Sequence, residues 1–253
     1  EEFYKCYVLY LQMKKRYELR AASLDERREF YEKEFSVEKV KKWFKDNGMK
    51  LPQICAVDAG SETRIIIDKK LTGEMLYFKF SELKKKIKKY SPEDVYYDRN
   101  FYEDVEKKLK KLKLGEWAKQ ELVFDIDADN IKCDHSKGKQ ICRKCLKKAY
   151  NWTLKMKKVL EEEFDFLKMR IVYSGRGFHI HVLDKRAFLL SKEERQDLVK
   201  KLEKFPIDPW VSRGYIELIR LPYSLNGLVS RKVVPLDVTN KFNEKMSIPK
   251  FLR

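Results

Sequence analysis

The chain has 253 residues, and its 57 Lys and Arg against 40 Asp and Glu give a net charge of +17 and a pI of about 9.4. This length suits one large domain or two small ones, and the charge favours a polyanionic partner, nucleic acid before a membrane surface. The sequence lacks an apolar run near the roughly 20 residues of a membrane span, a signal-peptide pattern at its start and the cysteine framework of a small secreted domain, so we expect a cytoplasmic protein.

The N-terminal part of the sequence predicts three helices. Residues 1–22 carry tyrosines and aliphatic residues at helical spacing, which indicates an amphipathic helix. The segment Ser23-Leu-Asp-Glu26 has the pattern of a capping box and predicts a second helix to about Glu34. Ser36 is a suitable N-cap for a third helix, which we expect to end at Asn47-Gly48.

Strands and basic helices are predicted next. Residues 63–67 and 75–80 flank a Thr-Gly pair and predict a β-hairpin. Ser81 is then expected to cap a lysine-rich helix. A strand at 94–97 and a strongly basic helix at 101–114 follow. The lysines of the second helix suit either a solvated face or a surface that meets phosphates.

Two carboxylates stand at the end of an apolar run in Glu121-Leu-Val-Phe-Asp-Ile-Asp-Ala-Asp129. In a strand, residues two apart point the same way, so Asp125 and Asp127 are predicted to lie side by side. Adjacent carboxylates repel each other unless a cation lies between them. Mg²⁺ and similar ions prefer oxygen ligands, and a pair of such ions serves phosphoryl or nucleotidyl displacement. A strand end with two solvated acids is the simpler alternative.

Four sulfur and nitrogen donors fall within 13 residues directly after this strand: Cys133, His135, Cys142 and Cys145. Two donors, a short loop with glycine and a Cys-x-x-Cys pair match the ligand spacing of tetrahedral zinc. Because all four positions are filled by protein donors, we expect a structural Zn²⁺ and not a catalytic one. Free thiols and a loop histidine remain the alternative.

A helix at about 143–164 is followed by a predicted hairpin at 169–183, whose turn carries Ser174-Gly-Arg-Gly177. Glycines allow backbone N–H groups to approach a phosphate, and arginine offers a planar fork to its oxygens. His179 and His181 are predicted to share one face of the second strand. Either histidine could contact a triphosphate or be an ordinary half-buried side chain.

The last third of the chain offers two candidates for a third metal carboxylate. Ser191 is expected to open a helix to about Lys204. Asp208 lies shortly after this helix, and Asp237 lies in a later apolar stretch. The periodicity of the sequence does not choose between the two acids.

Together, these motifs resemble a known family, the catalytic small subunit of archaeal and eukaryotic DNA primase. The order of the acidic strand, the Cys/His cluster, the Ser-Gly-Arg-Gly turn and the segment Leu218-Ile-Arg-Leu-Pro-Tyr-Ser224 is the order found in that family. The resemblance spans roughly residues 24–252. Four ordered signatures are specific in combination, although each one alone is weak.

The resemblance implies an α+β fold (mixed α/β), the archaeo-eukaryotic primase catalytic core, with mixed or antiparallel sheets flanked by helices. It further implies a single catalytic domain over 1–253 with a zinc-binding module at about 130–147. Relatives of this kind carry a long helical insertion at the place of residues 185–207. Only about two dozen residues stand there in this chain, so the insertion is missing or minimal.

The resemblance also implies roles for particular residues. In the family, an Asp-x-Asp pair and one distant Asp bind two Mg²⁺ or Mn²⁺ ions, which matches Asp125 and Asp127 with Asp208 in preference to Asp237. The residues that match the family's nucleotide contacts are Ser174, Gly175, Arg176, His179, Arg220 and, more loosely, Arg64. Asn226 stands where the family usually has a histidine, which puts a triphosphate contact at that position in doubt.

The function implied is that of a DNA primase, a nucleotidyltransferase that copies single-stranded DNA into short RNA or DNA primers from NTPs or dNTPs. Such small subunits work as heterodimers with a large iron–sulfur subunit. Two alternatives remain open on the residues alone. One is a repair-type polymerase or primase-polymerase of the same superfamily, which extends a supplied primer. The other is a zinc-stabilised nucleic-acid-binding subunit without catalytic activity.

Overall fold

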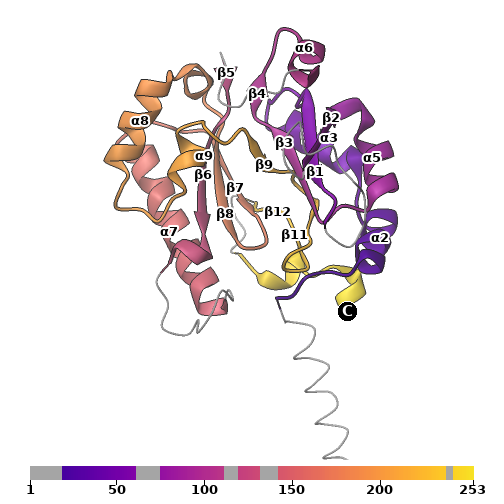
Figure 1. Ribbon diagram of the computed structural model, residues 1–253. Helices are drawn as coiled ribbons and strands as arrows, with labels where there is room; N and C mark the ends of the chain where they lie inside the picture. Colours follow the sequence, from indigo (N-terminus) through magenta and orange to yellow (C-terminus); the bar gives the residue numbers. More distant parts are fainter. Residues whose placement is uncertain (1–18, 61–74, 111–118, 132–141, 238–241) are drawn as a thin grey trace, which may run out of the picture.

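The protein is described from a computed structural model, which covers residues 19–60, 75–110, 119–131, 142–237 and 242–253. Two antiparallel sheets stand face to face in the middle of the molecule, and helices cover their outer sides (Figure 1). The protein therefore has a mixed α/β architecture with antiparallel sheets, as the family resemblance implied. The expected helix within residues 1–22 lies almost wholly outside the described residues.

The first sheet has six strands, and all their pairings are antiparallel. Their order is β11 (Arg231–Lys232), β10 (Leu225–Asn226), β3 (Asp94–Asp98), β1 (Ile54–Asp58) and β2 (Met75–Lys79), with β9 (Leu218–Arg220) also on β3. The helices on this side of the molecule are α2 (Leu24–Lys33), α3 (Val37–Asp46), α5 (Leu83–Tyr90) and α6 (Val105–Lys110) (Figure 1).

The second sheet has four antiparallel strands, in the order β12 (Val234–Pro235), β7 (Met169–Tyr173), β8 (Gly177–Val182) and β6 (Leu122–Asp127). On its side of the molecule lie α7 (Arg143–Glu162), α8 (Lys192–Lys201) and α9 (Pro209–Ser212) (Figure 1). A small third sheet pairs β4 (Asn100–Phe101) with β5 (Lys119–Gln120). Short 3-10 turns occupy Phe80–Glu82, Ala128–Asn130, Lys185–Leu189, Glu244–Ser247 and Lys250–Leu252.

The two faces of strand β6 contribute to two different hydrophobic cores. Leu122, Phe124 and Ile126 belong to the core shared with α7 and α8, whereas Val123 belongs to the core between the two sheets. Burying one such side chain contributes about 1.5–3 kcal/mol. Because strand residues alternate, the side chains of Asp125 and Asp127 follow Val123 toward the space between the sheets.

Local sequence signals explain the first helices. Ser23 and Glu26 form the predicted capping box, in which the serine side chain accepts from Glu26 N and the glutamate accepts from Ser23 N. Ser36 caps α3 as predicted, and this helix buries Val40, Trp43 and Phe44 against the first sheet. A cap of this kind stabilises a helix by about 1 kcal/mol.

Two predicted details are wrong, and a third is incomplete. Ser81 does not cap α5, because a 3-10 turn continues to Glu82 and the helix begins at Leu83 without a side-chain cap. The strand at 75–79 pairs with β1, which the sequence analysis overlooked; its expected partner at 63–67 lies outside the described residues. The helix expected from residue 101 begins only at Val105, because Phe101 pairs with Lys119 in the third sheet.

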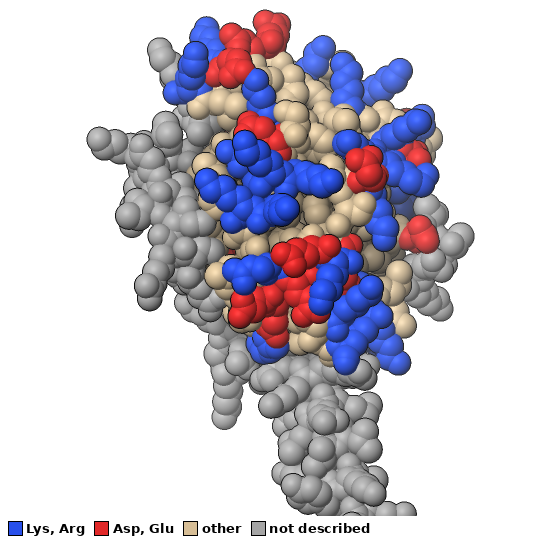
Figure 2. Space-filling model, turned by 90° about the vertical axis from the view of Figure 1, so that its right-hand side faces the viewer, with Lys and Arg blue, Asp and Glu red and all other residues tan. Residues whose placement is uncertain are grey.

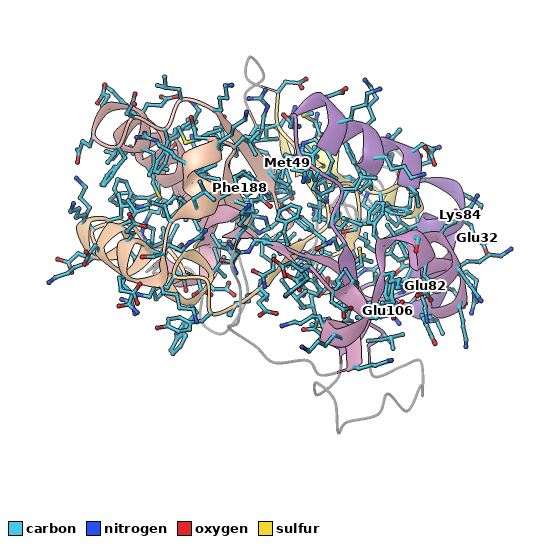
Figure 3. The ribbon with its side chains drawn as sticks, turned by 90° about the horizontal axis from the view of Figure 1, so that it is seen from above. Glu32, Met49, Glu82, Lys84, Glu106 and Phe188 are labelled. Atoms are coloured by element: carbon cyan, nitrogen blue, oxygen red, sulfur yellow. The ribbon has the colours of Figure 1, made fainter. Side chains whose placement is uncertain are left out.

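Side chains from the two halves meet in the middle of the molecule. Seen from above, Phe188 lies toward the centre from the side of the second sheet, and Met49 approaches from the side of the first (Figure 3). The centre of the Phe188 ring lies 6.2 Å from the centre of the Phe101 ring. Glu32, Glu82, Lys84 and Glu106 lie on the outer part of the first half (Figure 3).

The surface over the helices of the first half carries both signs of charge (Figure 2). Ion pairs at helical spacing join Lys33 to Glu29 and Lys42 to Asp46, at 3.0 and 2.9 Å. Exposed pairs of this kind contribute about 0.3–0.5 kcal/mol each. The positive excess of the chain is therefore partly neutralised on this face.

Candidate active site

Three aspartates lie near one another at one end of β6. Asp125 and Asp127 lie on the same face of the strand, as predicted. Asp208 is brought to them by a backbone hydrogen bond, in which its N–H donates to the carbonyl oxygen of Asp125 at 2.8 Å. Asp208 is also the N-cap of α9, where its Oδ1 accepts from Trp210 N at 2.8 Å. Its Oδ2 is therefore the oxygen left for another ligand.

The acids are held in an electrostatically unfavourable state. Burial raises the pKa of the Asp125 carboxyl well above its usual range, and the charges of Asp127 and Asp208 raise it further. Burial also raises the pKa of Asp127, although Arg176 and Arg220 oppose the rise. The Oδ1 atom of Asp125 is buried without a hydrogen-bond partner. Hard divalent cations prefer such oxygen donors, so the chemistry of these acids suits Mg²⁺ or Mn²⁺, although among the described residues no three acid, histidine or cysteine side chains are grouped closely enough to hold a metal ion as they stand.

The structure separates the two candidates for the third acid. The charge of Asp208 raises the pKa values of both Asp125 and Asp127. Asp237 is an exposed residue that follows β12. Burial raises the pKa of Tyr223, and the charge of Asp237 raises it further. The geometry therefore favours Asp208, as the family resemblance implied.

The turn from Ser174 to Arg176 joins β7 to β8 beside the acids. Ser174 Oγ accepts from Gly177 N at 3.0 Å, and the Nδ2 of Asn226 donates to Ser174 O at 2.9 Å. Gly175 has a φ of +97°, and a Cβ there would lie 2.7 Å from the Cβ of Asn226. A Cβ on Gly177 would meet the carbonyl oxygen of Ile126 at 2.3 Å. Gly175 is thus required by its left-handed backbone and the nearby Asn226 side chain, and Gly177 by its close approach to the backbone of β6.

Two arginines lie near the acids. Arg176 forms an ion pair with Asp129 and lies 4.0 Å from Asp127. Arg220 forms an ion pair with Asp94, and its guanidinium lies 5.1 Å from the ring centre of Tyr96. Burial acts to lower the pKa of Arg220, but the Asp94 carboxylate outweighs it, so the pKa is raised and the charge is retained.

His179 is the neutral member of the site. It lies opposite Asp125 in the strand pairing, with 3.7 Å between its Nε2 and Asp125 Oδ1. Burial lowers the pKa of His179 well below its usual range, and the electrostatic effects of His181 and Arg220 act in the same direction. Its Nδ1 and the Oδ1 of Asn226 are buried without hydrogen-bond partners. Polar atoms of this kind are costly unless a ligand satisfies them.

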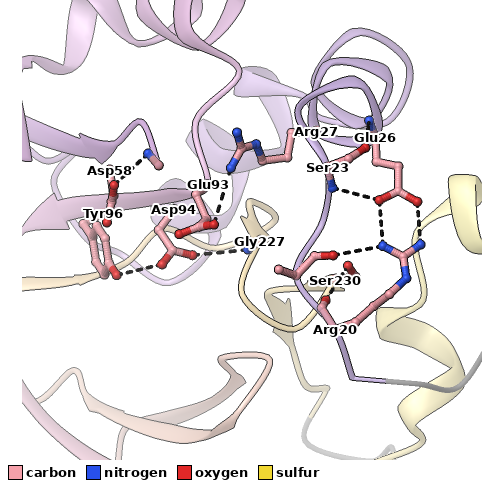
Figure 4. A network of polar contacts seen from close by, with 12 residues as sticks. Arg20, Ser23, Glu26, Arg27, Asp58, Glu93, Asp94, Tyr96, Gly227 and Ser230 are labelled. Carbon is pink, nitrogen blue, oxygen red and sulfur yellow. Dashed lines mark hydrogen bonds and ion pairs between the residues drawn. The ribbon is translucent and has the colours of Figure 1, made fainter. Parts of the chain in front are cut away.

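Asp94 is a site residue that the sequence analysis missed. It is buried at the start of β3, and its carboxylate accepts from Tyr96 OH at 3.1 Å and from Gly227 N at 3.3 Å (Figure 4). Neighbouring contacts join Arg27 to Glu93 and Arg20 to Glu26 (Figure 4). An acid at the start of a predicted strand was the available signal, but nothing in the sequence showed that Arg220 would pair with it.

The proposed zinc ligands and Arg64 are only partly described. Cys142 and Cys145 stand at the start of α7, with their sulfur atoms 3.2 Å apart. Cys142 Sγ also accepts from Cys145 N at 3.3 Å, so the helix start holds both thiols on one side. Cys133, His135 and Arg64 lie outside the described residues. Two converging sulfurs fit half of a tetrahedral zinc site.

The mixed α/β fold brings three half-buried aspartates, two arginines and a glycine turn together at one end of β6. Residues 124–205 match the family described as DNA primase small subunit. An uncharacterized DNA primase small subunit-like protein of Archaeoglobus fulgidus is 37% identical over 92% of both chains. The chain therefore belongs to the DNA primase small subunit family, and the resemblance drawn from its motifs is confirmed.

Other relatives are longer than this chain. The DNA primase small subunit PriS of Pyrococcus furiosus is 31% identical over 72% of this chain and 49% of its own length. The chain thus spans about half the length of this relative. A solved polymerase domain of Mycobacterium tuberculosis Ligase D, in complex with DNA, covers 64% of the chain at a TM-score of 0.42 and 16% identity. Among the helices of the described residues, none has the length and apolar character to cross a membrane.

Proposed function

We propose that this protein is a DNA-directed primase, a nucleotidyltransferase that synthesises short RNA or DNA primers on single-stranded DNA. The observation that carries the proposal is the convergence of Asp125, Asp127 and Asp208 with Arg176 and Arg220 at one end of β6. Membership in the DNA primase small subunit family supports the same activity. The protein would act inside the cell, where its template and nucleotides are found.

The three acids would hold the divalent cations. Asp125 Oδ1 and Asp208 Oδ2 are the oxygens available for coordination, and Asp127 lies beside them. Two Mg²⁺ or Mn²⁺ ions bound there would activate a 3′-hydroxyl and stabilise the leaving pyrophosphate. Cations would also relieve the repulsion that raises the pKa values of Asp125 and Asp127.

The turn and the arginines would hold the nucleotide. Arg176 would exchange its contact with Asp129 for phosphate oxygens, and Arg220, fixed by Asp94, would offer its remaining N–H groups. His179 is neutral, so it can donate one hydrogen bond to a phosphate oxygen without adding a charge. Ser174 and Gly175 would shape the turn so that backbone N–H groups reach the phosphates. Arg64 is proposed as a further phosphate contact on the family resemblance alone.

Synthesis on an unprimed single strand is the experiment that tests the proposal. We expect the purified protein, with labelled nucleotides and Mn²⁺ or Mg²⁺, to make short new oligonucleotides. An Asp125→Ala variant should make none while keeping its fold. Extension of an added primer without synthesis on unprimed template would instead indicate a repair-type polymerase. Absence of both products and of metal-dependent nucleotide binding would indicate a non-catalytic nucleic-acid-binding subunit.

A structural zinc ion is proposed for the segment at about 130–147. Cys133, His135, Cys142 and Cys145 would supply four protein ligands, and two of their sulfurs already lie together at the start of α7. We expect one zinc per chain by elemental analysis, lost in a Cys142→Ser, Cys145→Ser variant. Zinc content that is unchanged in this variant would contradict the assignment. A large iron–sulfur subunit is proposed as the partner on the family resemblance.

A further inference from the structure

An exposed aromatic pair stands directly beside the acidic site. Trp210 is 60% exposed and Tyr215 is 38% exposed, and their ring centres lie 5.5 Å apart. Ile216, the next residue, is 43% exposed. Single apolar side chains on a surface are ordinary, but neighbouring ones gathered at one place mark a binding surface. Neither aromatic residue has a part in the site described above.

Hydrogen bonds fix the turn that carries these rings. The N–H groups of Tyr215 and Ile216 both donate to the carbonyl oxygen of Trp210, at 3.0 and 3.2 Å. The buried guanidinium of Arg99 donates to Val211 O at 2.9 Å and also to Ile216 O. The side chain of Gln196 donates to the hydroxyl oxygen of Tyr215 at 3.0 Å. An aromatic surface fixed in this way loses little conformational entropy when a ligand stacks on it.

Two hydrogen bonds link this turn to the acidic strand. Asp208 N donates to Asp125 O, and Trp210 N donates to Asp208 Oδ1, each at 2.8 Å. A ligand on Trp210 would therefore lie at the edge of the three carboxylates. The same turn carries half-buried Arg213, which forms no side-chain ion pair among the residues that the structure describes.

We propose that Trp210 and Tyr215 form a stacking platform for an unpaired base of single-stranded nucleic acid next to the acidic site. Every base has a flat π-face, so stacking on an aromatic ring accepts any sequence. The +17 charge of the chain favours a polyanion, and Arg213 stands where a backbone phosphate can meet it. A protein partner would require a wider apolar surface than three side chains provide. The inference rests on the proposed function only in making the strand a template or primer.

Binding of single-stranded DNA by the full chain tests the platform, measured by fluorescence anisotropy without nucleotides or divalent cations. We expect Trp210→Ala to weaken binding about fivefold or more, since stacking on an aromatic side chain contributes about 1–3 kcal/mol per base. Trp210→Phe, which keeps a ring, should lose less. Tyr215→Ala should weaken binding in the same direction.

The matched control is Leu167→Ala. Leu167 is 67% exposed and precedes β7, whose other end leads into the Ser174 turn, so it lies away from the acids. This variant should bind as the wild type does. The Asp125→Ala variant removes a negative charge beside the proposed strand and should not weaken its binding, so that loss of synthesis and loss of stacking are told apart.

An oligonucleotide of the same length with abasic sites separates stacking from charge. It carries the same phosphates, so the wild type should bind it more weakly than normal DNA, and this difference should be smaller in Trp210→Ala and smallest when Tyr215 is also replaced by Ala. The dependence of binding on salt should be the same in wild type and Trp210→Ala, because stacking releases no counterions. Unchanged affinity of Trp210→Ala for normal DNA would overturn the proposal. If the same variant lost concentration-dependent self-association, the surface would belong to a second copy of the chain.

Discussion

Two histidine–carboxylate pairs lie on the same face of the second sheet and differ in the hydrogen bonds that their carboxylates accept. His179 faces Asp125 with 3.7 Å between Nε2 and Oδ1. His181, two residues further along β8, has its Nδ1 2.7 Å from Glu121 Oε1. The two imidazole rings lie only 5.8 Å apart. Residue type and burial are therefore nearly the same, and only the hydrogen bonding differs.

The difference separates a structural pair from a binding site. Both oxygens of Glu121 accept hydrogen bonds, one from His181 and the other from Tyr97 OH at 2.6 Å. Asp125, in contrast, has a buried oxygen without a partner and faces two further acids. Glu121 is therefore hydrogen-bonded within the protein, whereas the proposed function assigns the unpaired oxygen of Asp125 to a cation.

The largest expected effect is the loss of synthesis in Asp125→Asn. Removing a charge that holds the cations should reduce nucleotide incorporation by about 10²–10³-fold or more. The free energy of unfolding should stay the same or rise, because the repulsion from Asp127 and Asp208 is relieved. Asp208→Asn should behave alike, and Asp237→Asn is the matched control that should remain active. Loss of activity in Asp237→Asn with full activity in Asp208→Asn would reverse the choice of the third acid.

The opposite result is expected at the second pair. Glu121→Ala removes the acceptor of His181 and Tyr97 in a buried place, which should lower the free energy of unfolding by about 3 kcal/mol. Urea unfolding measures this change, with the exposed Glu203→Ala as a control expected to stay within about 0.5 kcal/mol. The folded fraction should still synthesise primers. A stable but inactive Glu121→Ala would show that Glu121 takes part in the reaction.

The sequence predicted the site better than it predicted the framework around it. The alternation of polar and apolar residues in 121–129 and the glycines of the 174–177 turn are local signals, and both segments fold as predicted. Strands β9 to β12 have two or three residues each; β9, β10 and β12 pair with strands far away in the sequence, and β11 pairs with its neighbour β10. Such short strands carry no periodicity that a sequence pattern can reveal.

Contacts between distant segments were also beyond the sequence. Nothing local indicates that Asp94 would pair with Arg220, 126 residues later, or that Arg99 would bind the carbonyl groups of the α9 turn. The choice of Asp208 over Asp237 came from the family resemblance and not from periodicity. The geometry supports that choice through one backbone hydrogen bond to Asp125, which only the fold could show.

A smaller effect should separate the two pairs through cation binding. Mn²⁺ or Mg²⁺ at a hundred times its dissociation constant should stabilise the wild type by about 2.7 kcal/mol, because only the folded chain assembles the three acids. Asp125→Asn should gain much less, whereas Glu203→Ala should gain as much as the wild type. Thermal unfolding with and without added cation measures the difference. Equal stabilisation of Asp125→Asn would place the cation elsewhere.

A third buried acid gives the smallest and most graded test. Asp98 on β3 accepts hydrogen bonds from Asn100 N and Tyr102 OH, both at 2.8 Å, so it resembles Glu121 in its contacts. Burial and then the charge of Glu217 nevertheless raise the pKa of Asp98 to about 7, against the effects of these bonds and of Lys108. The folded chain therefore keeps a proton that the unfolded chain loses above about pH 4.

The sign of the pH dependence follows from this raised pKa. Between about pH 4 and pH 7 the native state binds more protons at Asp98 than the unfolded state, so this residue makes stability fall as pH rises, by at most about 1.4 kcal/mol per pH unit. Above pH 7 the contribution is constant. Asp98→Asn should flatten the fall in urea unfolding measured at pH 5, 6 and 7, whereas Glu203→Ala should not. If the two variants showed the same slope as the wild type, hydrogen bonding at Asp98 would outweigh burial, and this acid would belong with Glu121.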